Sequence, residues 1–544
     1  MSRIASVNEI QCDGTSHPEP LQDRRIALSW TSTAKWLAWV IIVVGFLLRL
    51  RLLVSGRSLW VDEAAAGINI SLRDFGMLLD PMDYSQTVPL AYVLLTKLAA
   101  ILVGSGELGL RLAPFVAMFA ALILFYLLLR RMMPASEALP GLALFAVLPP
   151  LIQYAAEFKP YSIDVMFSVM LLCITLRAME EGARWYWKLL FGLATALGVW
   201  FSLALVFMTA GCGVALIGRA VLSKRNWRDG VQWAIVCAIS AMSFALHFWV
   251  YLRHMTKNPV LERFWAFYFA PIPPGSFDDI KWYLGRFLQF VEEPGGFTFV
   301  GLAAFLAFVG AASLWQTHRW FLAAILMPWV VNILASAVHL YPAGTRVVMY
   351  AVPGLLVLVT IGLASIGRWQ GQQARLGHLL LLGLLFLKPV EQAVAWVRVP
   401  YQKEEIRPVL EEVSKQVQPG DVVYLYNGVT LHWKYYVDTA NIVDGFDKAK
   451  VVIGVHSSLA RTNWSKYKED LAQLSGQPRV WLVMTHIWEA DGGNEERVLC
   501  YLLDGMGKRI ASVKHPGAVA HLYDLRSPSA VDGSVRPASP EAKP

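Results

Sequence analysis

Long apolar segments recur through the first 390 residues of the chain and are separated by short polar turns. A helix needs about 20 apolar residues to cross the roughly 30 Å hydrocarbon core of a membrane. Eleven segments meet this requirement approximately, and they predict a polytopic α-helical membrane protein. The predicted spans are 36–53, 109–129, 138–154, 160–177, 187–203, 204–222, 231–252, 297–315, 320–339, 346–366 and 374–390.

A twelfth apolar stretch, from Val88 to Val103, follows a different pattern. It is short, it is opened by Pro89, and it carries Lys97 near its middle. A charge at the centre of a bilayer costs about 2.5–3.5 kcal/mol or more. We therefore predict a juxtamembrane helix here, within a first outer loop that covers residues 54–108.

The same loop contains a second amphipathic pattern. Ile68, Leu72, Phe75 and Leu79 recur at helical spacing, and polar residues take the opposite face. A helix of this kind lies in the plane of a membrane surface with its apolar face buried. We expect this segment to lie flat on the membrane.

Lysine and arginine collect on one side of the predicted eleven-span arrangement. Cytoplasmic loops carry an excess of these residues, so the N-terminal segment 1–35 is predicted inside and the C-terminus outside. Counting 88–103 as a span would export most of the basic clusters. In the eleven-span arrangement, the inner loops hold Arg24, Arg25, Lys35, Arg130, Arg131, Arg177, Arg184, Lys188, Arg219, Lys224, Arg225, Arg228, Arg319, Arg368 and Arg375.

From about Arg398 the chain becomes charged and mixed in composition. Strand-like runs alternate with helical stretches there, a pattern typical of an α/β domain. We predict a soluble extracytoplasmic α/β domain over residues 391–526 and a disordered Ser/Pro/Ala-rich tail over 527–544. The predicted strands are 421–426, 450–455, 479–484 and 519–523, and the predicted helices are 404–416 and 495–507.

Composition agrees with a membrane protein that carries some soluble mass. Of the 544 residues, 56% are hydrophobic and 16% are charged, whereas soluble domains carry about 25% charged residues. This excludes a cytosolic enzyme and a disordered scaffold. The net charge of +8 is expected mainly in cytoplasmic loops, so it does not indicate a nucleic-acid partner. The five cysteines form neither a CxxC pair nor a Cys/His cluster.

Ionisable residues near a membrane are candidates for function, and here they gather in the outer turns. The acidic pair Asp62-Glu63 follows the first predicted span directly. Its simplest interpretation is a solvated pair at a helix N-terminus, which carboxylates favour. Arg111, one turn inside the next span, could bind a phosphate through its planar fork or could snorkel to lipid headgroups.

Two later outer turns are equally rich in polar groups. One turn carries Glu157, Lys159, Tyr161 and Asp164 within eight residues, which packing alone explains poorly, although Glu157 and Lys159 could neutralise each other. The other turn runs from His339 through Tyr341 to Arg346 at a helix start. Together the four outer clusters predict one site on the outer face.

The order of these clusters resembles a known family. An Asp-Glu pair after the first span, a Pro-containing juxtamembrane helix, an Arg after Gly-x-x-Glu, a Glu-x-Lys-Pro-Tyr turn and a late Tyr-Pro-x-Gly-x-Arg turn are similar to the C-type glycosyltransferases (GT-C). The resemblance covers residues 36 to 390 and is nearest to the bacterial branch with protein O-mannosyltransferases and lipid A aminoarabinose transferase. It implies a GT-C transmembrane domain in the bacterial inner membrane with its active site outside.

The resemblance also implies an activity and residue roles. Such enzymes take a sugar from a polyprenyl-phosphate donor and pass it to a glycan, lipid or protein acceptor. The acceptor hydroxyl needs a base and the departing phosphate needs cations. By match to the family pattern, Asp62 is the base candidate and Glu63 orients it or the acceptor. The substrate- and phosphate-binding candidates are Arg111, Lys159 and Arg346, with Glu157, Tyr161, Asp164 and Tyr341 beside them.

Several alternatives stay open at this level. A single displacement would invert the anomeric centre, whereas retention would need a second carboxylate as nucleophile. No dense Asp/Glu/His grouping indicates a metal, so cofactor use and a divalent metal remain undecided. Other function classes are a transporter or flippase of lipid-linked saccharides, which would place polar groups at the bilayer midplane, and a polysaccharide polymerase or ligase.

Overall fold

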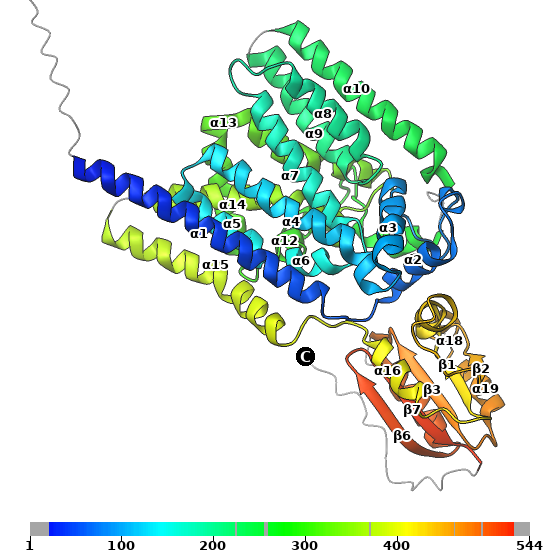
Figure 1. Ribbon diagram of the computed structural model, residues 1–544. Helices are drawn as coiled ribbons and strands as arrows, with labels where there is room; N and C mark the ends of the chain where they lie inside the picture. The colour runs from blue at the N-terminus through cyan, green and yellow to red at the C-terminus, as the bar shows by residue number, and fades with distance from the viewer. Residues whose placement is uncertain are drawn as a thin grey trace, which may run out of the picture.

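A bundle of apolar helices and a small α/β domain make up the chain in the computed structural model (Figure 1). The structure describes residues 21–223, 226–254, 259–368, 371–461, 463–490 and 493–526. The predicted tail 527–544 and most of the N-terminal segment 1–35 lie outside the described residues. The predicted fold class, a polytopic helical membrane protein with a C-terminal α/β domain, is confirmed.

The helices of the bundle follow the predicted apolar segments. Shorter helices occupy the predicted outer connections: α2 (Val61–Leu72), α3 (Leu90–Val103), α11 (Pro259–Trp265) and α12 (Phe277–Glu292). The bundle itself consists of α1 (Leu21–Leu53), α4 (Glu107–Met132), α5 (Ala135–Val147), α6 (Pro149–Gln153), α7 (Tyr161–Ala178), α8 (Tyr186–Gly198), α9 (Leu205–Gly218), α10 (Trp227–Val250), α13 (Val300–Ala337), α14 (Val352–Gly367) and α15 (Gln372–Arg398).

The number of spans differs from eleven when length and apolarity are applied to the structure. Within the described residues, eight helices qualify, or nine when the pair 135–147 and 149–156, bent by 60°, counts as one span. Helix α8 has only 13 residues. Helix α13 covers two predicted spans and is broken at His318, where the backbone is not helical. The exact count therefore stays a prediction.

Both breaks have a local cause. Leu148 is extended (φ −61°, ψ 125°) and precedes Pro149 and Pro150, and a residue before proline is driven out of the helical region. His318 lies in the polar stretch Gln316-Thr-His-Arg319. A straight helix of 38 residues would be about 57 Å long, nearly twice the hydrocarbon thickness.

Glycines bring the central helices close together. A Cβ atom on Gly310 of α13 would lie 1.9 Å from the Leu358 carbonyl oxygen of α14, and one on Gly362 would lie 2.0 Å from that of Leu306. Only glycine permits such an approach of two backbones, as at other membrane helix interfaces. Helix α14 is consequently buried along nearly its whole length.

The C-terminal domain is built on a five-stranded sheet in the order β2-β1-β3-β7-β6. Strands β1 (Val422–Leu425), β2 (Lys450–Ile453) and β3 (Val480–Thr485) are parallel, and β7 (Ala518–Asp524) runs antiparallel to β3. These four strands match the four predicted ones. Strand β6 (Lys508–His515) was not predicted; it is an edge strand with exposed charges. Helices α16 (Ile406–Ser414) and α20 (Glu495–Asp504) match the predicted helices.

Helix α2 covers only the first part of the amphipathic segment around residues 68–79, which was predicted to lie flat on the membrane. It ends at Leu72, and Arg73 turns away to donate hydrogen bonds to the carbonyls of Met77, Asp80 and Pro81. Ile68 is buried, and the backbone at Gly67 packs against the ring of Tyr435 in the C-terminal domain. One side of the helix therefore packs against protein, whereas Leu72, Phe75 and Leu79 are exposed. Contact of this segment with the membrane stays a prediction.

Candidate active site

The outer turns predicted to form one site meet at the pole of the bundle beside the C-terminal domain. Helix α2 starts there at Val61, so the side chains of its first turn project into this region. The turn after η2 (Tyr154–Ala156) and the start of η6 (Thr345–Ala351) supply the other groups. Asp62, Lys159, Tyr161 and Arg346 come together directly.

Asp62 holds the centre of this cluster. Its Oδ2 accepts a hydrogen bond from Arg346 Nη2 at 3.0 Å and lies 3.6 Å from Lys159 Nζ. The side chains of Asp62 and Arg346 are 28% and 24% exposed, so a ligand can reach both. Arg346 also donates from Nε to the Tyr161 hydroxyl at 3.1 Å, and Lys159 donates to Gln86 Oε1 at 2.9 Å. Two cations thus share one partly exposed carboxylate.

Trp60 forms the wall of the cluster. The guanidinium of Arg346 lies 4.9 Å from the centre of its ring, and Lys403 Nζ of the C-terminal connection lies 3.2 Å from it. Cations are attracted to the face of an indole ring. Burial lowers the pKa of Lys403, which neighbouring acids partly counteract. The site therefore has an excess of positive charge around one carboxylate.

Glu63 points to a different side of α2 from Asp62. Its side chain is fully buried and faces Arg111, which is also fully buried, through two hydrogen bonds of 2.9 and 2.6 Å. The N–H of Phe158 adds a third, at 2.6 Å. Burial alone would raise the pKa of Glu63, but the charge and hydrogen bonds of Arg111 lower it below the usual range.

Arg111 is engaged on every side by protein. Besides Glu63, it donates to the backbone carbonyls of Arg57 at 2.8 Å and Ser58 at 3.0 Å. These two residues lead into α2, so Arg111 holds the chain that carries Asp62. This position differs from the predicted phosphate contact, because Arg111 lies about one helix turn below the surface and its side chain is 0% exposed.

Glu157 lies behind the cluster rather than in it. Its side chain is buried and accepts a hydrogen bond from Gln153 at 3.3 Å. Burial, and then the negative charge of Glu63, raise the pKa of Glu157. It does not neutralise Lys159, whose ion-pair partner is Asp62.

Two predicted site residues lie apart from Asp62. Asp164, one turn into α7, is buried, and its Oδ1 has no hydrogen-bond partner. Tyr341 donates its hydroxyl to the Val347 carbonyl at 3.1 Å and packs edge-on against Phe207. Both belong to the packing beneath the site, and no contact of either with Asp62, Lys159 or Arg346 is seen among the described residues.

Left-handed backbone occurs next to two of the site's polar groups. Tyr84 and Ser85 have φ of 62° and 56° and precede Gln86, and Thr345 has φ of 53° and precedes Arg346. Non-glycine residues adopt this region rarely, and they do so more often at functional sites. The strained turns aim Gln86 and Arg346 at Lys159 and Asp62.

The approach to α2 is also held by residues that the sequence analysis missed. Glu404, Glu405 and Tyr436 of the C-terminal region accept hydrogen bonds from backbone N–H groups of residues 58–61. A signal existed, since Lys403-Glu404-Glu405 follows the last span as Asp62-Glu63 follows the first. The bonds are Ser58 to Glu405 (3.0 Å), Leu59 to Tyr436 (2.7 Å) and Val61 to Glu404 (2.9 Å), and Trp60 donates to Glu63 (3.3 Å).

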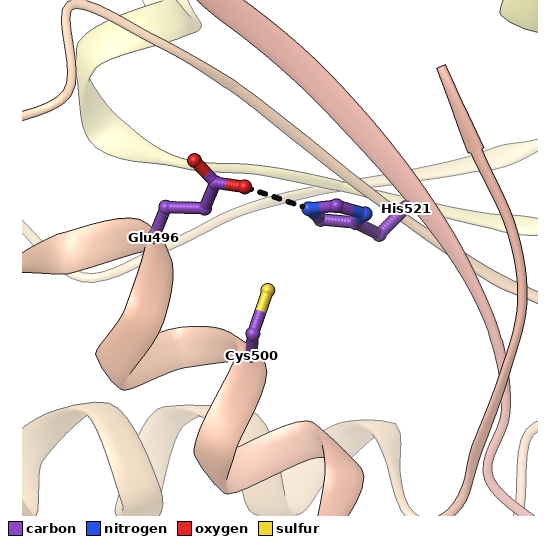
Figure 2. Close-up of side chains that lie close together, drawn as sticks. All are labelled: Glu496, Cys500 and His521. Atoms are coloured by element: carbon purple, nitrogen blue, oxygen red, sulfur yellow. Dashed lines mark hydrogen bonds and ion pairs between the residues drawn. The ribbon is translucent and has the colours of Figure 1, made fainter. Parts of the chain in front are cut away.

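The surroundings of Asp62 do not fit a divalent cation as arranged. Such ions need several oxygen ligands, but Asp62 faces two cations and Glu63 faces Arg111. Among the described residues, one group has three metal-ligand atoms within 4.8 Å of one another: Glu496 and Cys500 on α20 and His521 on β7. Figure 2 shows these three side chains converging inside the C-terminal domain.

This group is accounted for by ordinary pairing. The Glu496 carboxylate lies 3.2 Å from His521 Nε2 and accepts a hydrogen bond from Lys514 at 3.1 Å. The other ring nitrogen of His521 lies 2.8 Å from the Ser512 hydroxyl. Hydrogen bonding by His521 lowers the pKa of Glu496 to about 2. The group is therefore a hydrogen-bonded network inside the domain and not part of the Asp62 cluster.

Comparisons with known proteins agree with this architecture. A sequence model of the dolichyl-phosphate-mannose-protein mannosyltransferase family matches residues 87–267. No curated protein sequence matches the chain. The crystal structure of ArnT from Cupriavidus metallidurans bound to undecaprenyl phosphate is 13% identical with a TM-score of 0.52, covering 90% of this chain and 98% of that one. The GT-C fold is confirmed.

Two further structures were compared. ArnT from Cupriavidus metallidurans in the apo state is 12% identical with a TM-score of 0.50 over 91% of this chain and 98% of that one. The archaeal oligosaccharyltransferase AglB from Archaeoglobus fulgidus, in complex with an inhibitory peptide and a dolichol-phosphate, is 13% identical with a TM-score of 0.48. The match covers 90% of this chain and 74% of that one. The two ArnT structures confirm the predicted resemblance to GT-C type membrane glycosyltransferases at the level of the fold.

Proposed function

We propose that this protein transfers a sugar from a polyprenyl-phosphate donor to a hydroxyl group of a glycan, lipid or protein acceptor on the outer face of a bacterial inner membrane. The observation that carries the proposal is the partly exposed Asp62 carboxylate with Arg346 at 3.0 Å and Lys159 at 3.6 Å. A base and two cations at one point are what this reaction requires. The undecaprenyl phosphate bound in the ArnT structure supports a lipid phosphate as the ligand.

The reaction assigns each of the three groups one task. Asp62 accepts the proton of the acceptor hydroxyl while that oxygen forms a bond to the anomeric carbon. The bond between this carbon and the phosphate oxygen breaks, and its electron pair leaves with the phosphate. Lys159 and Arg346 stabilise the negative charge that accumulates there. One displacement inverts the anomeric centre, and no residue other than Asp62 is needed as a base.

Arg111 and Glu63 take a different task in this proposal. Because their charges are satisfied by each other and by backbone carbonyls, they hold the start of α2 in place. The phosphate is assigned to Lys159 and Arg346, whose shared partner, Asp62, becomes free to act as a base when a phosphate replaces it. Tyr161 keeps the Arg346 guanidinium oriented.

The test is transfer by purified protein in lipid nanodiscs. Polyprenyl-phosphate sugars labelled in the sugar are offered with candidate acceptors, and products are identified by mass spectrometry together with the anomeric configuration. Parallel analysis of lipid-linked sugars and surface glycans from cells with and without the gene identifies the native pair. Movement of the intact labelled donor across the membrane without cleavage would instead favour the transporter class. Repeated addition of saccharide units would favour a polymerase.

A further inference from the structure

The segment that leads into α2 is held almost entirely by side chains. Residues 57–60 lie between two regular helices and Val61 begins α2, and the N–H groups of 57–61 have no helical or sheet partners. Buried backbone groups must be paired, because leaving one unpaired costs about 1–3 kcal/mol. In this segment three of four successive N–H groups, those of Ser58, Leu59 and Val61, donate to the C-terminal region.

Glu404 makes the contact nearest to Asp62. Its Oε2 accepts from the N–H of Val61, the first residue of α2, where a carboxylate also interacts favourably with the helix dipole. Two histidines hold the carboxylate, with His486 Nδ1 2.8 Å from Oε1 and His432 Nε2 3.2 Å from Oε2. Burial alone would raise the pKa of Glu404, but the histidines lower it well below the usual range.

The neighbouring contacts fix the same segment from the same side. Glu405 accepts from the hydroxyl as well as the N–H of Ser58, and the Ser58 hydroxyl accepts from the N–H of Arg407. Tyr436, which accepts from the N–H of Leu59, donates to Glu107 at 3.0 Å. Lys403 lies against the ring of Trp60. Arg111 and Glu63 hold the opposite side.

We infer that Glu404 is a positioning residue through which the C-terminal domain sets the direction of the Asp62 carboxylate. The inference rests on the proposed function, because it gives the domain a part in the same transfer reaction. A displacement of about 1 Å at a reacting group can cost about 100-fold in rate. Loss of the Glu404 contact should therefore lower kcat more than it changes the KM for the donor.

The experiment compares Glu404→Ala and Glu404→Gln with wild type in nanodiscs. We expect kcat to fall about 10- to 100-fold for Glu404→Ala, with a donor KM within about threefold of wild type. Glu404→Gln keeps an oxygen that can accept from Val61 and should retain more activity. Glu412→Ala is the matched control, because Glu412 also pairs with a histidine of this domain, His515, at an exposed position.

Hydrogen–deuterium exchange supplies a readout that does not depend on activity. Amides of residues 58–63 should exchange faster in Glu404→Ala, while peptides from β1, β3 and β7 should not change. If Glu404→Ala fails to fold, Tyr436→Phe removes the acceptor for Leu59 at nearly unchanged volume and should give the same local change with a smaller fall in kcat.

The outcomes separate this inference from the proposed function. Unchanged exchange at 58–63 with unchanged kcat overturns the positioning role, and so does faster exchange spread through the whole C-terminal domain. A wild-type protein that transfers no sugar from any polyprenyl-phosphate donor overturns the proposed function. In that case a local increase in exchange at 58–63 still supports the mechanical link between Glu404 and the start of α2.

Discussion

Asp62 and Glu63 are adjacent in the chain but belong to two regions with opposite properties. The open side of α2, formed by Asp62, Lys159 and Arg346, is partly exposed and carries more positive than negative charge. The closed side, formed by Glu63 and Arg111, is fully buried, and its positive and negative charges balance. Successive residues of a helix point about 100° apart, so one acidic pair can serve both sides. The proposed function assigns the reaction to the open side, because its unbalanced charge can be reached by a ligand.

A substitution of Asp62 tests the difference between the two sides most directly. Asp62→Asn keeps the shape of the side chain but cannot accept the acceptor proton, and general-base contributions are about 10²- to 10⁴-fold. We expect transfer per molecule to fall by that factor while thermal stability stays near wild type. Asp74→Asn, an exposed acid of the same outer loop that accepts from the Met77 N–H, is the control. Near-normal turnover in folded Asp62→Asn would remove Asp62 as the base.

The closed side should respond through stability. Removing one member of a buried ion pair costs about 3–5 kcal/mol, because the other charge is left unpaired. Arg111→Ala and Glu63→Gln should therefore lower the melting temperature and the yield strongly. Arg131→Ala is the control, since its partner Glu180 and Arg131 itself are both 39% exposed. If Arg111→Ala were stable and impaired only in donor binding, Arg111 would return to the phosphate site.

The open side should show the reverse pattern. Lys159→Ala and Arg346→Ala remove charge-assisted contacts worth about 1.5–3 kcal/mol, which corresponds to about 10- to 100-fold in kcat/KM. Arg346→Lys should lie between wild type and Arg346→Ala, because it keeps the charge but loses the planar fork. Donor binding, single-turnover transfer and melting temperature are measured together, with Lys281→Ala as an exposed control. Unchanged kinetics for both alanine variants would contradict the phosphate role.

The apolar pattern was enough to predict most of the fold. Hydrophobic runs mark the helices of the bundle, and buried strands such as Val480–Thr485 show up as continuous apolar sequence. Strand β6 was not predicted, because this edge strand is largely exposed and its mixed sequence KRIASVKH lacks a continuous apolar run. The break before α6 and the joining of two predicted spans in α13 were not predicted, because a helix boundary depends on one or two residues, such as Pro149 and His318.

The site was predictable in its members but not in their arrangement. Outer turns that hold Asp62, Lys159 and Arg346 can be recognised by their charge, and the structure brings these residues together. Whether Arg111 faces a ligand or Glu63 depends on depth and rotation within the bundle, which charge alone does not encode. The contact between Ser58 and Glu405 joins residues 347 positions apart. The acidic pair after the last span is visible in the sequence, but the residues that it contacts are not.

The smallest effect is expected far from α2, at the partly buried carboxylate of Glu496 in the C-terminal domain. His521 lowers the pKa of Glu496 to about 2, first through its hydrogen bond. A lowered carboxyl pKa stabilises the fold above the ordinary pKa of about 4.5, and this stabilisation is lost as the pH falls toward 2. Glu496→Gln should therefore lower the melting temperature slightly at pH 7, and the difference from wild type should shrink between pH 4.5 and 2. Lys514 is exposed, so solvent screening keeps the effect small.

Transfer at pH 7 by Glu496→Gln should be unchanged, in contrast to Glu404→Ala. Melting curves across this pH range and transfer assays on the same preparation test both halves, and a large loss of transfer in Glu496→Gln would show that the domain acts on the site through more than its contacts with residues 58–61.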